Sequence, residues 1–351
     1  MLSLLLFSRN DTKNALSLAE SMLNAVDEVV IIDSSDEKEH NELVEKARKY
    51  RKINVFYALP LGYVEPLRSY GISKCKADWI FYLDTDERPN EKLLSDLNKI
   101  VNSDCDAFAI KRYEEATASS HTQFFTWQFR LFKKSAALFK GIIHEQPIIN
   151  GKLCTLGDNY FIAHRIDLMH HERNDYNKML LFEMLSYRQY NEVFLDYIRK
   201  FFAIDQKSIS GKIILGFFNA LLHAYETLFF KKQDSEISRR DYLWFYFIRT
   251  LAYGFRHGRI GSIFEIWNGQ KKYFEYLEKE REKLAEKYGL KRVDLFNISQ
   301  IIYKEGVIKY LGFDKPENVE KLTNEYLQGK LKEKGTDLTI RLIVEKYKKR
   351  R

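Results

Sequence analysis

The chain has 351 residues, of which 45% are hydrophobic, 30% are charged and 15% are aromatic. With only five prolines and no low-complexity tract or internal repeat, this composition excludes a disordered chain and a solenoid. The formal net charge of +8 is unevenly placed, because residues 1–150 hold 20 Lys and Arg against 22 Asp and Glu, whereas residues 151–351 hold 37 against 27. The basic second half predicts an anionic partner, either a membrane surface or a nucleic acid.

The first hundred residues alternate between strand and helix patterns. Short apolar runs that fit buried strands are separated by segments whose apolar residues recur at helical spacing. This repeating βαβ order predicts a parallel sheet with helices on both faces. The predicted strands cover residues 2–8, 28–33, 53–59 and 79–83, and the predicted helices cover about 13–23, 37–51, 65–76 and 90–101.

Beyond about residue 106 the pattern changes. Strand-like segments at 107–112, 128–133 and 160–164 follow one another without regular helices between them, which predicts added or antiparallel strands that complete a mixed sheet. From about residue 174 onward the chain reads as helix. We therefore predict an α/β domain at residues 1–172, a helical, aromatic-rich region at 173–285, and a small helical C-terminal region with a basic tail at 286–351.

Two acids follow the fourth predicted strand directly. Alternate residues of an extended chain point the same way, so Asp84 and Asp86 can face one point while Thr85 faces away. Ligands of open α/β sheets bind outside the carboxyl ends of the strands, where these acids fall. Two carboxylates on one point suit Mg²⁺ or Mn²⁺, with diphosphate oxygens and water in the remaining positions. A solvated turn with two exposed acids is the alternative interpretation.

Five segments in chain order resemble the family 2 glycosyltransferases, whose catalytic domain has the nucleotide-sugar-binding GT-A fold. The resemblance implies a GT-A-like mixed sheet with flanking helices over about residues 1–165, followed by a mainly α-helical C-terminal region. The fifth segment is similar to the Gly-x-x-His-Glu element of the branch that includes lipopolysaccharide-core transferases. The segments are Ser8-Arg9-Asn10-Asp11, Ile32-Asp33-Ser34-Ser35-Asp36, Gly62 to Ile72 with Arg68, Asp84-Thr85-Asp86, and Arg130-Leu131-Phe132 followed by Gly141-Ile142-Ile143-His144-Glu145.

The resemblance also implies roles for single residues in binding a nucleotide-sugar. Asp33 accepts a hydrogen bond from the ring N–H of uracil or a related base, and Ser8, Asn10 and Asp11 line the same pocket. Asp11 can equally be only a helix N-cap, and Asp33 only a turn residue. Arg68 binds the diphosphate or an adjacent acid, because a guanidinium matches phosphate oxygens.

The same resemblance assigns the cofactor and the catalytic residues. Mn²⁺ or Mg²⁺ is held by Asp84, Asp86 and His164, although Asp84 can contact the ribose instead. Glu145 is the candidate base that removes the proton of the acceptor hydroxyl, and His144 is either the base itself or a ligand of the metal or diphosphate. Glu115 is a rival base.

The second half of the chain bears on partners and location. Residues 212–230 and 242–255 are apolar and aromatic with basic residues beside them, which is typical of helices that lie on an anionic membrane surface, although the two faces can also bury each other or pair two subunits in a homodimer. Three cysteines without metal-like spacing, Cys75, Cys105 and Cys154, favour reduced thiols in a cytoplasmic protein. We expect a protein of the cytoplasm that can act peripherally at the inner face of the cell membrane.

The sequence therefore predicts a metal-dependent, inverting glycosyltransferase. Its donor is a nucleoside-diphosphate sugar, with a UDP-sugar favoured, and its acceptor is a hydroxyl, which can belong to a lipid-linked sugar or a cell-envelope glycan. Two other classes stay open. One is a non-enzymatic protein that binds nucleic acid or lipid through the basic half, although no nucleic-acid motif is present and no nucleic acid is expected. The other is a nucleotidyltransferase, although the Gly-rich phosphate loop that this class needs after the first strand is absent from this sequence.

Overall fold

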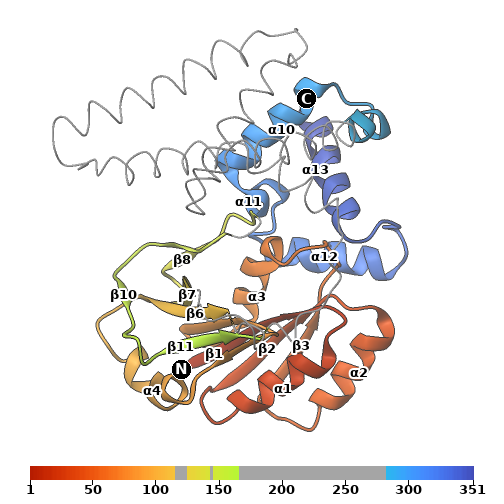
Figure 1. The fold of residues 1–351 in the computed structure, drawn as a ribbon. Helices are drawn as coiled ribbons and strands as arrows, with labels where there is room; N and C mark the ends of the chain where they lie inside the picture. The colour runs from red at the N-terminus through yellow and green to blue at the C-terminus, as the bar shows by residue number, and fades with distance from the viewer. Residues whose placement is uncertain (115–124, 143–144, 166–281) are drawn as a thin grey trace, which may run out of the picture. The chain divides into compact units, whose positions relative to one another are not determined.

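The computed structural model describes residues 1–114, 125–142, 145–165 and 282–351. Within these ranges the chain forms a nine-stranded mixed sheet of order β3-β2-β1-β4-β7-β6-β11-β5, with β10 paired to β6, and a small β8–β9 sheet (Figure 1). The strands are β1 (Leu2–Ser8), β2 (Glu28–Asp33), β3 (Ile53–Tyr57), β4 (Trp79–Asp84), β5 (Glu87–Pro89), β6 (Ala107–Glu114), β7 (Phe125–Lys133), β8 (Ala137–Leu138), β9 (Ile148–Ile149), β10 (Leu153–Thr155) and β11 (Phe161–His164).

The first four strands run parallel, as the sequence predicts. β1 pairs with β2 on one side and with β4 on the other, and β2 pairs with β3. Every residue of β1 and β2 is buried, which explains why these strands read as unbroken apolar runs rather than as alternating ones. The helices between them are α1 (Thr12–Met22), α2 (Glu37–Ala47), the 3₁₀ turn η1 (Glu65–Leu67) with α3 (Arg68–Lys74), and, after β4, α4 (Glu91–Val101).

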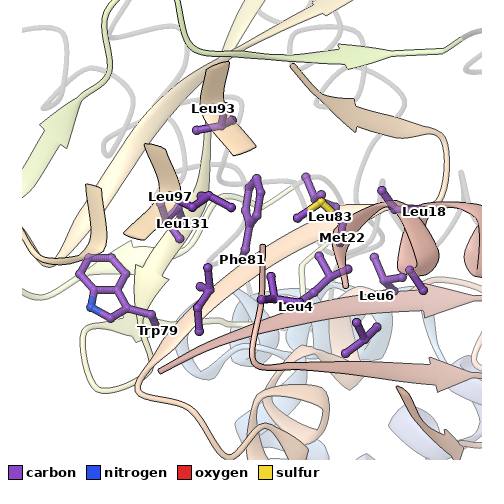
Figure 2. Close-up of a cluster of buried hydrophobic side chains, with 14 of the residues drawn as sticks. Leu4, Leu6, Leu18, Met22, Trp79, Phe81, Leu83, Leu93, Leu97 and Leu131 are labelled. Atoms are coloured by element: carbon purple, nitrogen blue, oxygen red, sulfur yellow. The ribbon is translucent and has the colours of Figure 1, made fainter. Parts of the chain in front are cut away.

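Helices cover both faces of the sheet, and each face has its own apolar core. On one face Leu4, Leu6 and Phe81 pack against α1, α2 and α4, as Figure 2 shows for the side chains of Leu18, Met22, Leu93 and Leu97. On the other face Leu5, Ile32 and Ile80 pack against α3 and against residues of the C-terminal helices. The alternation of side chains along each strand divides one apolar run between the two cores.

The remaining strands extend the sheet as predicted in type. β7 is antiparallel to β4 and β6, and β11 is parallel to β6 but antiparallel to β5. The fold class predicted from the sequence, a mixed α/β sheet with flanking helices and a helical C-terminal region, is confirmed. The strands β5, β8, β9 and β10 were not predicted, because a segment of two or three residues carries no recognisable hydrophobic period.

In the described C-terminal part of the chain, residues 282–288 are helical, and they are followed by the helices α10 (Arg292–Glu305), α11 (Val307–Leu311), α12 (Pro316–Leu327) and α13 (Thr336–Arg350). Residues 305–346 return to the N-terminal domain and form one compact unit with residues 1–175. The loop after β3 anchors this return, because the Leu59 N–H donates to Thr323 Oγ1 over 3.2 Å and Thr339 Oγ1 donates to the Leu61 carbonyl over 2.7 Å.

A second compact unit comprises residues 176–304 and 347–351. In its described part, Asp294 on α10 accepts hydrogen bonds from Tyr347 Oη at 3.0 Å and from Arg351 at 2.9 Å. The predicted aromatic helices at 212–230 and 242–255 and the predicted boundary at residue 172 lie outside the described residues, so the three-region division stays a prediction. Among the residues that are described, no helix is long and apolar enough to cross a membrane.

The cysteines do not all carry the predicted free thiol. Cys105, ahead of β6, and Cys154, on β10, form a disulfide, while Cys75 is a buried free cysteine. The expectation of three reduced thiols is therefore wrong for this pair. Cys154 and Cys105 are 49 residues apart, but the parallel pairing of β10 with β6 brings them together. The argument for a cytoplasmic protein that rested on reduced cysteines loses its basis.

The disulfide makes a prediction about thiol number and stability. Protein purified without reductant and then denatured should show one reactive thiol, and three after reduction. Reduction should also lower the free energy of unfolding by about 2–4 kcal/mol, because it frees a loop of about 50 residues in the unfolded chain. A thiol titration in denaturant and paired melting curves measure both quantities. Three reactive thiols before reduction would contradict the disulfide.

Candidate active site

The candidate site lies at the edge of the sheet where the parallel strands end. Ser8, Asp33 and Asp84 are the last residues of β1, β2 and β4. The register pairs Ser8 with Asp33 and Phe7 with Asp84, so the three strand ends are neighbours. Ligands of open α/β sheets bind at this edge. The fold thus brings together residues that the sequence analysis selected from three separate segments.

Asp33 is fully buried, and both of its carboxylate oxygens have partners. Ser35 Oγ donates to Oδ1 over 2.6 Å, and His40 Nδ1 lies 2.7 Å from Oδ2. The His40 ring in turn meets the ring of Tyr57 edge-on, with centroids 4.8 Å apart. A carboxylate fixed in this way is a preorganised hydrogen-bond acceptor at the end of β2.

The turn after β1 is tied to both neighbouring strand ends. Asn10 has a φ of 51°, a conformation that asparagine tolerates. Its backbone N–H donates to Ser35 Oγ over 2.7 Å, and its side-chain oxygen accepts from the Asp36 N–H over 2.9 Å. Asp11 is buried at the N-cap position of α1, and its Oδ2 accepts a 2.6 Å hydrogen bond from Thr85 Oγ1. The predicted residues Asn10 and Asp11 therefore connect the ends of β2 and β4.

A buried arginine holds two acids at the end of β4. Nη2 of Arg130, on β7, donates to Oδ2 of Asp84 and to Oε1 of Glu87, each over 2.5 Å. Glu87 is fully buried, and Arg112 Nη1 lies 3.3 Å from the same Oε1. The hydroxyl of Tyr82 donates to Asp84 Oδ1 over 2.9 Å. Both oxygens of Asp84 are therefore held by the protein.

Burial and the neighbouring charges together set the ionisation of the two acids. Burial raises the pKa of Asp84, but the positive charges of Arg130 and Arg68 outweigh it, and the net pKa is lowered. For Glu87, burial and the charge of Asp84 raise the pKa, and they prevail over Arg130. Two neighbouring carboxyl groups disfavour the ionisation of both, so Asp84 loses its proton at a lower pH than Glu87 does.

The predicted residue Arg68 is buried beside the same tyrosine. The Cζ atoms of Arg130 and Arg68 lie 4.4 Å and 5.1 Å from the centroid of the Tyr82 ring. Arg68 Nη2 donates to Tyr82 Oη over 3.3 Å, and Nη1 donates to the Glu145 carbonyl over 2.9 Å. The carboxylate of Glu65 is 3.7 Å from Arg68. Two buried guanidiniums thus share one site with several acids and an aromatic ring.

Asp86 and His164 meet, as the sequence analysis requires of two metal ligands. His164 Nε2 lies 3.2 Å from Asp86 Oδ2, and the antiparallel pairing of β11 with β5 brings the two residues together. A carboxylate oxygen and an imidazole nitrogen on one point are suitable donors for Mn²⁺ or Mg²⁺ when substrate phosphates complete the coordination. No group of three potential metal ligands occurs in the described residues. Asp84 contacts Arg130 and Tyr82.

Glu145 lies in a tight turn that satisfies its carboxylate with backbone groups. The N–H groups of Lys140 and Gly141 donate to Oε2 and Oε1, each over 2.8 Å. Burial raises the pKa of Glu145 and outweighs the opposing effects of Arg68 and of the two N–H groups, so the pKa is about 7. A carboxylate with a pKa near the working pH is suited to accept a proton. His144 and the rival base Glu115 lie outside the described residues.

A buried tyrosine hydroxyl lies in the same region. Tyr63 Oη is inaccessible to solvent and has no hydrogen-bond partner among the residues described. Burial raises its pKa well above the usual value, and the charges of Glu65 and Glu145 add to the effect. The hydroxyl therefore stays protonated and is a donor that a ligand or water at the site can satisfy.

Several residues of this site were not found by sequence reasoning. His40 lies on a charged helix, where a histidine carries no positional signal, and Tyr82 reads only as a core residue of β4. Glu87 follows Asp86 directly, and Arg130 belongs to a motif for which the family resemblance implies no role. A signal for the last two existed, since an acid and a base that both occupy strand positions among apolar residues need each other as partners.

The fold and the site together define a mixed α/β domain with an acidic edge, and comparison with known families agrees with this fold. Residues 3–150 match the model of the family described as glycosyl transferase family 2. This part of the chain is a family 2 glycosyltransferase domain. The similarity of its Gly-x-x-His-Glu element to one branch of the family stays a prediction. None of the curated protein sequences is significantly similar to the chain.

The solved structures that match the chain include those of S. aureus TarS. A TarS structure is 14% identical with a TM-score of 0.43 over 76% of this chain, and the chain spans 55% of that TarS chain. TarS 1–349 is 13% identical with a TM-score of 0.43, covering 93% of this chain and 91% of its own. The same fragment in complex with UDP is 12% identical with a TM-score of 0.41, covering 77% of this chain and 91% of its own.

The buried ion pair predicts a large and specific loss of stability. Arg130→Gln should lower the free energy of unfolding by about 3–5 kcal/mol, because Glu87 would stay buried without its main partner. Arg112→Gln is the matched control, and its loss should be smaller because its contact is longer, at 3.3 Å. The double change Arg130→Met with Glu87→Met should recover most of the loss. Denaturant unfolding measures all three, and equal losses for the two single variants would contradict the assignment.

Glu145 predicts a pH-dependent stability. Its pKa of about 7 in the folded chain exceeds the ordinary value of 4.5, so folding binds a proton between these pH values. Its contribution is therefore fully present below pH 4.5 and falls as the pH rises through 7. The stability of the native protein relative to Glu145→Gln should fall by about 3 kcal/mol between pH 4.5 and 7.5. A difference that does not vary with pH would show that the carboxyl titrates normally.

Proposed function

We propose that this protein is a divalent-cation-dependent, inverting glycosyltransferase that moves a sugar from a UDP-sugar to a hydroxyl group. The observation that carries the proposal is that Asp33, Asp84 and the Asp86–His164 pair gather at the carboxyl edge of a family 2 domain. That edge is the ligand-binding edge of open α/β sheets.

We assign the recognition of the nucleotide base to Asp33. An ionised carboxylate only accepts hydrogen bonds, so it selects a base whose ring nitrogen carries a proton, as in uracil, over one whose ring nitrogen is an acceptor, as in cytosine. Ser35 and His40 fix the orientation of this carboxylate. Ser8, Asn10 and Asp11 complete the base and ribose pocket.

We assign the binding of the diphosphate and the cation to residues near the end of β4. Asp86 and His164 would hold Mn²⁺ or Mg²⁺, and the bound ion would offset the negative charge of the departing diphosphate. Arg68 adds a buried positive charge for the same oxygens. Asp84 is assigned to the ribose, because Arg130 and Tyr82 occupy its oxygens. Asp84 can act as a third metal ligand only if Arg130 releases it.

The transfer step requires a base next to the acceptor. Glu145 takes the proton of the acceptor hydroxyl while the acceptor oxygen forms a bond to the anomeric carbon. The bond between that carbon and the diphosphate oxygen breaks, the electron pair leaves with UDP, and the configuration inverts. The pKa of about 7 suits Glu145 for this role. His144 is the alternative base.

The acceptor and the location are proposed from the sequence. The aromatic and basic segments 212–230 and 242–255 support an acceptor on an anionic membrane surface, such as a lipid-linked sugar or a cell-envelope glycan, with the enzyme on the cytoplasmic side. The same helices can pair two copies in a homodimer. The nucleic-acid-binding and nucleotidyltransferase alternatives gain no support from the acidic edge of the sheet.

A melting assay tests the function. With Mn²⁺ present, UDP should raise the melting temperature more than CDP, ADP or GDP, and at about 100 times Kd the gain should be about 2.7 kcal/mol. Asp33→Asn should remove the preference for UDP, because an amide can also donate a hydrogen bond.

Asp86→Ala should remove the effect of Mn²⁺. Asp104→Ala, an exposed acid at another surface, is the control and should respond like the native protein. Equal shifts for all four nucleotides would contradict the assignment of the base pocket.

A further inference from the structure

The turn that carries Glu145 is packed directly against the C-terminal helix α11. The backbone N–H of Ile308, in the first turn of α11, donates to the carbonyl of Lys140 over 3.0 Å. Gly306 precedes this helix with a φ of 80°. A Cβ atom at Gly306 would lie 2.6 Å from the Lys140 carbonyl oxygen and 2.8 Å from the Lys140 Cα. No side chain fits between α11 and Lys140.

The contact is equally close from the side of the turn. Gly141 has a φ of 79°, and a Cβ atom there would lie 2.8 Å from Cγ1 of Ile308 and 3.3 Å from the Cα of Pro66. Ile308 is 2% exposed and belongs to the apolar core on this face of the sheet. The peptide groups of residues 140 and 141 are therefore held between α11 and η1.

The same two residues bind the carboxylate of Glu145. The N–H groups of Lys140 and Gly141 donate to its two oxygens over 2.8 Å, while the Lys140 carbonyl, on the other side, accepts from α11. A displacement of Lys140 would move both donors away from the carboxylate. The packing of α11 thus fixes the position of Glu145 through the intervening backbone.

Among the described residues, the charged side chains that act on Glu145 lie in η1 and at the start of α3. Arg68 Nη1 is 3.8 Å from Glu145 Oε1, and Glu65 is 3.7 Å from Arg68. Tyr63 adds a buried neutral hydroxyl. Since η1 also contacts Gly141 through Pro66, the surroundings of Glu145 depend on the same close packing.

We propose that Gly306 and Ile308 are positioning residues for Glu145, which makes residues 305–346 a working part of the active site although the family match ends at residue 150. The inference rests on the proposed function, in which Glu145 takes the proton of the acceptor. Neither residue touches the substrate. Both act by holding the backbone donors of the Glu145 carboxylate.

The test compares Gly306→Ala with Gly329→Ala. Gly329 is a matched control, because it lies in the same C-terminal segment with a φ of 70°, but a Cβ atom there meets no atom within 4 Å. The first readout is the titration of Glu145 in protein with ¹³C-labelled glutamate carboxyls, assigned by comparison with Glu145→Gln. The second is kcat and KM for UDP release from whichever of UDP-glucose, UDP-galactose and UDP-N-acetylglucosamine stabilises the protein most.

In Gly306→Ala the titration midpoint of Glu145 should move from about 7 toward its ordinary value, because the displaced turn lets water reach the carboxyl. The kcat should fall by about tenfold or more, as expected when a reacting group is misplaced, and the donor KM should stay within about twofold. Gly329→Ala should keep the native titration and the native kcat. The titration of Glu145 tests the positioning role of Gly306 even if the chosen UDP-sugar turns over slowly.

The outcomes separate this inference from the proposed function. If Gly306→Ala behaves like Gly329→Ala in both readouts, the positioning role is overturned. If Glu145→Gln keeps native turnover, Glu145 is not the base and the proposed mechanism fails, whatever Gly306→Ala shows. If Gly306→Ala does not fold, Ile308→Val loosens the same contact more gently, and an unchanged titration and kcat in that variant overturn the role.

Discussion

The compensation of buried acids by two buried arginines is the constraint on which this site depends. Asp84, Glu87 and Glu145 lie at one region of the sheet edge, and water is largely excluded from the side chains of Glu87 and Glu145, while that of Asp84 is partly exposed. Acids in such a position must be neutral or paired, because an isolated buried charge costs far more than a fold can tolerate. Arg130 and Arg68 supply the positive charge, and both contact the ring of Tyr82. The site can therefore hold several carboxylates close together while the domain stays folded.

The parallel topology explains how such a site arises from separate segments. Because β1, β2 and β4 run in the same direction and in register, whatever follows each strand reaches the same edge. The antiparallel strands then add what the parallel ones lack: β7 brings Arg130, and β11 brings His164 to Asp86. The C-terminal helices close the arrangement behind Lys140 and Gly141. In the proposed function, the nucleotide, the cation and the catalytic base therefore take neighbouring positions along this edge.

The sequence predicted the parts of this structure that have a local signal. Strands buried on both faces, such as β1 and β2, are unbroken apolar runs, and the acids that end β2 and β4 stand out against them. Contacts between distant residues have no such signal. The Cys105–Cys154 disulfide depends on the pairing of a three-residue strand, and Thr339 bonds to Leu61 across 278 positions of sequence. His40 was missed for the same reason, since only the fold shows that it faces Asp33.

The most direct test of the account is the crystal structure of the protein with UDP and Mn²⁺. The account predicts that the ring N–H of uracil donates to the Asp33 carboxylate, and that Mn²⁺ is coordinated by Asp86 and the diphosphate beside His164. It also predicts that the Arg130–Glu87 pair persists in the complex. UDP bound away from the ends of β2 and β4, or a diphosphate bound with no contact to Asp86, would contradict the proposed donor site.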